Sequence, residues 1–188
     1  MIRIAIIIGS TRPGRKSDAV ARWVHDLAAR RDDAKFELLD LADYPLPHLD
    51  EPSPAAHGPD HYSHGHTRAW AAAIATYDGY IFVTPEYNHS TTGVLKNAID
   101  YLYVEWHNKA AGFVSYGLTG GTRAVEHLRL VMGELQIADV RAQVALTLFD
   151  DFDGDRLTPG THQKEILATM LDQTIAWSRA LATVRSSA

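Results

Sequence analysis

The chain has 188 residues, of which 46% are hydrophobic and 22% charged, and this balance is typical of a folded globular protein. Its formal net charge of −5 at pH 7 offers no basic surface to nucleic acid, and no apolar run is long enough to span a membrane, so we expect neither as a partner. The absence of cysteine excludes disulfides and thiolate sites and favours a cytoplasmic location. The length predicts one α/β domain over residues 1–188.

Strands and helices are predicted to alternate along the chain. Apolar runs without polar alternation, typical of strands buried on both faces of a parallel sheet, recur between segments with helical spacing. In chain order we expect a strand at 2–8, a helix around 20–28, a weaker strand at 35–41, a helix after 65, a strand at 80–83, a helix around 95–102, a strand at 110–115, a helix at 122–135, a weaker strand at 140–148 and a helix at 161–183. Thr158 and Pro159 are predicted to cap and begin the last helix. This order predicts right-handed crossovers and a three-layer α/β/α sandwich, with 140–148 at an edge of the sheet.

The segment Asp43–Gly65 is rich in proline and is predicted to be a long irregular connection, of a length that in compact domains is usually functional or mobile. Four histidines, His57, His61, His64 and His66, fall in or just after it. Their spacing does not match the helix or finger patterns of zinc sites, so we expect no metal.

The first motif is Gly9–Ser17, which lies where the first strand gives way to the first helix. Short hydroxyls and glycines at a helix N-terminus suit a phosphate, since free amides and the helix dipole point at it and Arg12 adds charge-assisted hydrogen bonds. Neither Gly-x-Gly-x-x-Gly nor the Gly-x-x-x-x-Gly-Lys-Ser/Thr loop is present. The motif therefore predicts a phosphomonoester site, with a polar turn capped by a serine as the alternative.

The second motif is Thr84–Asn88, which ends the third strand and is followed by the segment Thr92–Asp100, where the next predicted helix starts. In parallel sheets, ligands bind outside the carboxyl ends of the strands, near the point where the strand order reverses. A Pro-Glu-Tyr-Asn turn offers backbone amides and an aromatic ring to a flat heterocycle. The alternative is a helix-entry turn with a buried tyrosine.

The third motif is Ser115–Gly121, at the end of the fourth strand. Its three glycines allow the backbone to approach a ligand closely and to expose amides to it. Taken alone, the segment is equally typical of a flexible strand-to-helix turn. Three such loops after strands one, three and four favour one shared site.

Together, in this order and spacing, the motifs resemble those of the NADPH-dependent FMN reductases of the flavodoxin-like superfamily, whose relatives include quinone and azo reductases. The resemblance extends from Ile4 to about Leu135 and rests on Gly-Ser-x-Arg-x-x-x-x-Ser, on Thr-Pro-Glu-Tyr-Asn before Leu-Lys-Asn-Ala-Ile-Asp, and on Ser-x-Gly-x-x-Gly-Gly. It implies a flavodoxin-like fold with a five-stranded parallel sheet in the order 2-1-3-4-5. It also implies non-covalently bound FMN, with NADPH or NADH as reductant.

By this resemblance the three motifs supply the flavin-binding residues, which approach the phosphate, the isoalloxazine ring and the other edge of the ring in turn. For the phosphate they are Ser10, Arg12 and Ser17. For the isoalloxazine ring they are Pro85, Glu86, Tyr87 and Asn88, and for its other edge they are Ser115, Gly117, Gly120 and Gly121. No side chain is nominated as a catalytic acid or base.

The implied function is hydride transfer from a reduced nicotinamide to FMN, followed by electron transfer to a small acceptor such as free flavin, a quinone or an azo compound. Two alternatives stay open: FMN released in reduced form to a flavin-dependent monooxygenase, and a flavodoxin-type electron carrier without a nicotinamide site. Arg12 stands against the carrier, because flavodoxins tend to have neutral hydroxyls there. The family is usually dimeric or tetrameric, so a homodimer or homotetramer is expected, with Leu95, Ile99 and Leu102 either in its interface or in the core.

Overall fold

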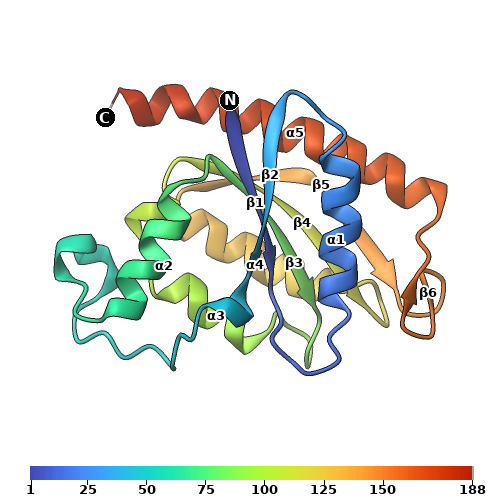
Figure 1. The fold of residues 1–188 in the computed structure, drawn as a ribbon, viewed down its shortest axis with the longest axis horizontal. Coiled ribbons are helices and arrows are strands. Elements are labelled where there is room, and N and C mark those ends of the chain that lie inside the picture. Colours follow the sequence, from blue (N-terminus) through green and yellow to red (C-terminus); the bar gives the residue numbers. More distant parts are fainter. Residues whose placement is uncertain (188) are drawn as a thin grey trace.

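The computed structural model describes residues 1–187. Its centre is a five-stranded sheet in the order β2-β1-β3-β4-β5, and every neighbouring pair is parallel (Figure 1). The strands are β1 (Ile2–Ile8), β2 (Ala34–Asp40), β3 (Gly79–Pro85), β4 (Lys109–Gly117) and β5 (Ile137–Thr147). This order confirms the predicted flavodoxin-like topology and places β5 at an edge.

Helices cover both faces of the sheet and make the predicted three layers. One face packs against α1 (Ser17–Ala28) and α5 (Thr161–Ser186). The other face packs against α2 (Gly65–Ala75), α3 (Gly93–Asp100) and α4 (Thr122–Glu134). In Figure 1 the long α5 runs along the top of the view, and α2 and α3 lie on the side away from α1.

Burial on both faces explains why the strands are apolar without alternation. Along β1, Ile4, Ile6 and Ile8 face α1 and α5, whereas Ala5 and Ile7 face the opposite layer. All five are at most 2% exposed, and apolar side chains on both faces are what a central parallel strand requires.

The α3 residues Leu95 and Ile99 and the following Leu102 belong to the core, each with 1% of its surface exposed. The interface alternative for these side chains is therefore wrong. The amphipathic α3 turns its apolar face inward onto the sheet, as helices that cover a sheet generally do.

The last helix begins at Thr161, as predicted, but the residues expected to cap it do not do so. Gly160 is the N-cap of α5 and no side chain caps the helix, so Thr158 and Pro159 do not supply its cap and first turn. Instead, the amide of Thr158 donates to the carbonyl of Asp151 at 2.8 Å and closes a hairpin that was not predicted. Its strands, β6 (Phe152–Asp153) and β7 (Arg156–Leu157), are antiparallel and have two residues each, too short for a periodic signal.

The long connection between β2 and α2 is irregular, as predicted, and contains only short 3-10 turns. It loops out beside α2 and α3 in Figure 1. Asn97 of α3 fastens it, because the side-chain amide donates to the carbonyl of Pro47 at 2.7 Å and accepts from the amide of Leu49 at 3.0 Å. Tyr101 adds a hydrogen bond to Asp50 at 2.8 Å. Within residues 1–187, no helix is long and apolar enough to cross a membrane.

Glu37 on β2 makes the stability of the fold depend on pH. Hydrogen bonds from Lys35, Arg3 and Tyr77 lower the pKa of this carboxyl from 4.5 to about 2, even though partial burial opposes the shift. Because the pKa is lower in the folded state, the contribution is complete above about pH 4.5 and is lost as the pH falls towards 2. Solvent screening limits this contribution to about 1 kcal/mol.

We expect Glu37→Gln to remove the part of the acid sensitivity of stability that Glu37 contributes, as measured by urea unfolding between about pH 3 and 5. An unchanged pH profile would contradict the assignment.

Candidate active site

The three sequence motifs meet at the carboxyl edge of the sheet. The amide of Gly9 donates to the carbonyl of Val83 at 2.8 Å, which joins the ends of β1 and β3. Ser10 Oγ lies 3.0 Å from Tyr87 Oη, and Pro85 pairs in register with Tyr116 of β4. The structure therefore brings the predicted residues of all three loops into one region.

The phosphate loop, defined here as Gly9–Ser17, ends at an uncapped helix. Lys16 is the N-cap of α1 and its side chain caps nothing, so the first amides of the helix remain available. Ser17 is fully buried, and its Oγ has no hydrogen-bond partner among residues 1–187. Arg12 is exposed, and no acidic partner for it exists in the described part of the chain.

These features fit a phosphomonoester such as that of FMN. A buried hydroxyl without a partner carries a desolvation cost, and free helix amides with a positive dipole favour an anion. Arg12 adds a charge that nothing in residues 1–187 neutralises, and its guanidinium lies 6.0 Å from the centroid of the Tyr87 ring. The donor set therefore suits two or more negatively charged oxygens.

Arg15 shapes the phosphate loop, although no sequence pattern singles it out. Its guanidinium donates to the carbonyl of Ser10 at 2.7 Å and forms an ion pair with Asp40 at the end of β2. Both side chains are about one-fifth exposed or less. The loop is thereby fixed to the neighbouring strand before any ligand arrives. The only signal in the sequence is the acidic residue that ends the second strand.

The turn after β3, Tyr87–Ser90, has two residues in the left-handed region. The amide of Tyr87 donates to the carbonyl of Ser90 at 2.9 Å, and the amide of Ser90 donates to the carbonyl of Tyr87 at 3.2 Å. Between them Asn88 has φ of 49° and His89 has φ of 74°, the pair of positive angles that a type I′ turn requires. The side chain of Tyr87 is 36% exposed, so the predicted buried-tyrosine alternative is wrong.

Glu86 joins the turn after β3 to the start of α4. Its carboxylate accepts from the amide of Arg123 at 3.2 Å and pairs with the guanidinium of Arg123 at 2.5 Å. The side chain is only 7% exposed. The N-cap of α4 is Gly121, which offers no capping side chain, so Glu86 supplies from another loop the anion that a helix N-terminus favours.

Glycines build the loop after β4. Gly121 has φ of +69°, and a Cβ there would lie 2.8 Å from the amide nitrogen of Tyr116. A Cβ on Gly120, with φ of +73°, would lie 2.9 Å from Ala145 Cβ. Ser115 is fully buried beneath this turn, and its hydroxyl donates to the carbonyl of Gly120 at 2.7 Å. Gly117 lies opposite Gly121, since a Cβ added to Gly117 would approach the Gly121 amide nitrogen to 3.3 Å.

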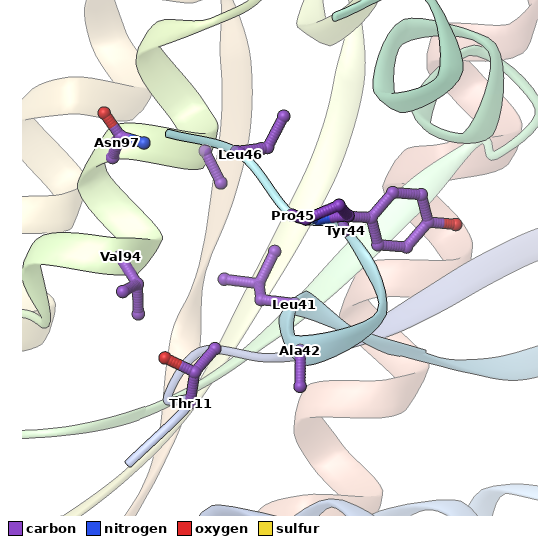
Figure 2. A pocket seen from close by; sticks show the side chains of 9 residues that line it. Thr11, Leu41, Ala42, Tyr44, Pro45, Leu46, Val94 and Asn97 are labelled. Carbon is purple, nitrogen blue, oxygen red and sulfur yellow. The ribbon is translucent and has the colours of Figure 1, made fainter. Parts of the chain in front are cut away.

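A cavity of about 380 Å³ opens beside the phosphate loop, between α3 and the start of the long connection (Figure 2). Its walls are mostly aliphatic, and the lining residues are Thr11, Leu41, Ala42, Tyr44, Pro45, Leu46, Val94, Asn97 and Ala98. Figure 2 shows the Tyr44 ring turned away from the other labelled side chains, and the ring packs edge-on against Trp70 at 4.8 Å. Sequence reasoning did not find this cavity.

The histidines in and just after the long connection contact Asp50 and each other. His66 Nε2 lies 3.0 Å from Asp50 Oδ1, and the rings of His64 and His66 stack at 5.1 Å. Across residues 1–187, no group of three or more His, Asp or Glu side chains is arranged to hold a metal ion.

The fold and the site define a flavodoxin-like α/β protein whose strand-end loops form one surface with a phosphate-accepting end. The family model described as NADPH-dependent FMN reductase matches residues 2–151. The chain belongs to this family.

Similar curated proteins support this family membership. An NAD(P)H-dependent FMN reductase of a Nectria species is 47% identical over 140 residues, which cover 70% of each chain. One of Schizosaccharomyces pombe is 41% identical over 146 residues, 78% of this chain and 73% of the relative. A 2-hydroxy-1,4-benzoquinone reductase of a Burkholderia species is 30% identical and covers 95% of this chain and 97% of its own. Among solved structures, FerB, a flavoenzyme NAD(P)H:(acceptor) oxidoreductase from Paracoccus denitrificans, shares the fold with a TM-score of 0.72 at 21% identity over 96% and 98% of the chains.

Proposed function

We propose that the chain binds FMN at the carboxyl edge of the sheet and acts as an NAD(P)H-dependent FMN reductase or quinone reductase. The observation that carries the proposal is the phosphate loop, which contains the buried Ser17 hydroxyl, the uncapped start of α1 and the exposed Arg12, for which residues 1–187 offer no acidic partner. Family membership supports the choice of FMN, since the family is named for it.

The flavin ring is proposed to lie between the turn after β3 and the loop after β4. Tyr87 offers an exposed aromatic face beside Ser10, and Pro85 and Asn88 flank it along the chain. Glu86 acts by fastening the turn to α4, since its carboxylate is already engaged by Arg123. Gly117, Gly120 and Gly121, held over Ser115, let backbone amides approach the other edge of the ring.

FMN, when bound, supplies hydride-accepting chemistry, and the protein contributes binding, orientation and electrostatics. Arg12 and the helix amides hold the phosphate, while the backbone of the glycine-rich loop places donors where negative charge develops. Neither half-reaction needs a protein nucleophile, in keeping with the lack of a nominated acid or base. The acceptor is proposed to be a small molecule such as a quinone, and the 30% identical benzoquinone reductase supports that class.

The experiment that tests this proposal is an absorbance titration of the purified protein with FMN, followed by anaerobic addition of NADPH and, separately, NADH. We expect a protein-bound flavin spectrum that bleaches with a reduced nicotinamide and recovers with benzoquinone. A flavin that binds but does not bleach with either nucleotide would favour the electron carrier, and absence of binding would refute the site. Retention of the yellow colour after exhaustive dialysis would identify FMN as a prosthetic group. Loss of the colour would identify FMN as a product that the protein releases, in reduced form, to a monooxygenase.

The proposal includes self-association as a homodimer or homotetramer, as the family resemblance implies. The exposed apolar side chains that could take part in such a contact include Val94 on α3 at 40% and Leu130 on α4 at 78%. They replace the buried residues of α3 as interface candidates.

A further inference from the structure

His89 occupies a strained position that the contacts around it explain. Its φ of 74° lies in the left-handed region, which non-glycine residues adopt at a cost of about 1–2 kcal/mol. Such strain persists where the surroundings hold it and is frequent at functional sites. The turn that carries His89 is the one beside Tyr87, at the carboxyl edge of β3.

Arg123 holds the His89 ring. Its Nη1 lies 3.1 Å from His89 Nδ1, and because a guanidinium can only donate, Nδ1 must be the acceptor. The proton of the neutral imidazole is therefore on Nε2. His89 is exposed, and Nε2 has no hydrogen-bond partner within the described chain.

Arg123 is itself fixed from three sides. It pairs with Glu86, and its Nη2 donates to Thr119 Oγ1 at 3.0 Å. Its backbone lies in the first turn of α4. The guanidinium thus connects the turn after β3 to the loop after β4, the two segments that frame the proposed flavin ring. An imidazole N–H held this way is pre-oriented, which lowers the entropy cost of binding a partner oxygen.

We propose that His89, oriented by Arg123, donates a hydrogen bond from Nε2–H to a carbonyl oxygen of a substrate at the flavin site. Two substrates carry such an oxygen, the nicotinamide carboxamide and a quinone acceptor. The inference rests on the proposed function and deepens it. Arg123 is a positioning residue, since it acts through His89.

The first test uses the FMN-free protein and therefore does not depend on activity. Imidazole ¹⁵N NMR should show His89 as the Nε2–H tautomer in the wild type. Arg123→Lys keeps a positive charge for Glu86 but lacks the planar guanidinium that reaches both Glu86 and His89. The His89 ring in this variant should therefore become a mixture of tautomers. A mixed tautomer in the wild type, or no change in the variant, would overturn the role of Arg123 even if FMN proved not to bind.

The second test measures each half-reaction of the FMN-loaded protein by stopped flow. His89→Asn keeps a residue that tolerates positive φ but removes the imidazole donor. We expect the rate constant with NADPH, or that of reoxidation by 1,4-benzoquinone, to fall about tenfold, as loss of one neutral hydrogen bond predicts. Reoxidation by ferricyanide, which has no carbonyl, should not change. A fall confined to NADPH identifies the carboxamide, and a fall confined to benzoquinone identifies the acceptor.

Three controls separate orientation from general damage. Arg123→Lys combined with His89→Asn should be no slower than His89→Asn alone, because both act on one contact. His127→Asn removes a neighbouring ring, 6.2 Å from that of His89, and should leave all three rates unchanged. The FMN dissociation constant should stay within about twofold in His89→Asn and in His127→Asn. Equal losses with ferricyanide and benzoquinone, or no loss in either half-reaction, would overturn the proposal.

Discussion

Replacing Ser17 with alanine is expected to weaken FMN binding by about 10- to 100-fold while leaving the FMN-free protein as stable as before or slightly more stable. The Ser17 hydroxyl is buried and unpartnered within residues 1–187, so its removal relieves a desolvation cost in the empty protein. In the complex the same hydroxyl would donate to a phosphate, and hydrogen bonds to charged groups contribute about 1.5–3 kcal/mol. Fluorescence titration with FMN and urea unfolding without FMN measure the two effects separately.

Ser178 of α5 provides the matched control. It is also fully buried and its Oγ also lacks a partner among the described residues, but it lies in the last helix rather than in the phosphate loop. Ser178→Ala should match Ser17→Ala in unfolding and leave FMN affinity unchanged. Equal FMN affinities for Ser17→Ala and the wild type would remove Ser17 from the site.

Gly121→Ala is expected to lower the free energy of unfolding by about 3 kcal/mol or more and to abolish measurable FMN binding. The substitution adds left-handed strain of about 1–2 kcal/mol. It also drives a Cβ to 2.8 Å from the Tyr116 amide nitrogen and 2.9 Å from Ser115 Cβ, which the backbone must move to relieve. That movement displaces the loop after β4 and the start of α4. Thermal and urea unfolding, with FMN titration, test the expectation.

Gly14→Ala isolates the strain from the clash. Gly14 has the same φ of +69°, but a Cβ there would meet nothing within 4 Å. Its cost in unfolding should therefore be about 1–2 kcal/mol. Equal destabilisation by the two variants would mean that the contacts around Gly121 relax freely, and the steric account of that loop would fail.

Much of the fold followed from simple patterns. The core strands, such as Ile2–Ile8, are apolar on both faces because the sheet is covered on both sides, and this pattern is readable without a structure. The β6–β7 hairpin was missed because its strands are too short to carry a period, and Thr158 was wrongly taken as the cap of the last helix because that residue serves the hairpin instead. Helix caps and turns use the same residue types, so only the hydrogen-bond partner of the residue distinguishes a cap from a turn.

The site was predictable as a set of loops but not as a set of contacts. Parallel topology requires the strand ends to meet, which placed Ser10, Tyr87 and Gly117 in one region. The pairs Arg15–Asp40 and Glu86–Arg123 depend on how each turn directs a side chain, and residues 25 and 37 positions apart give no local signal of contact. The same limit concealed the cavity beside Thr11.

The missing local cap of α4 has a consequence for the order of folding. A helix whose N-cap is Gly121, at φ of +69°, has little in its own sequence to mark its start, and the carboxylate that supplies the cap comes from Glu86 across the β3–β4 pair. Its first turn gains that stabilisation only after the two strands have docked. Because contacts distant in sequence form only after loop-closure entropy has been overcome, we expect the start of α4 to consolidate late, as one cooperative unit with the turn that binds the flavin.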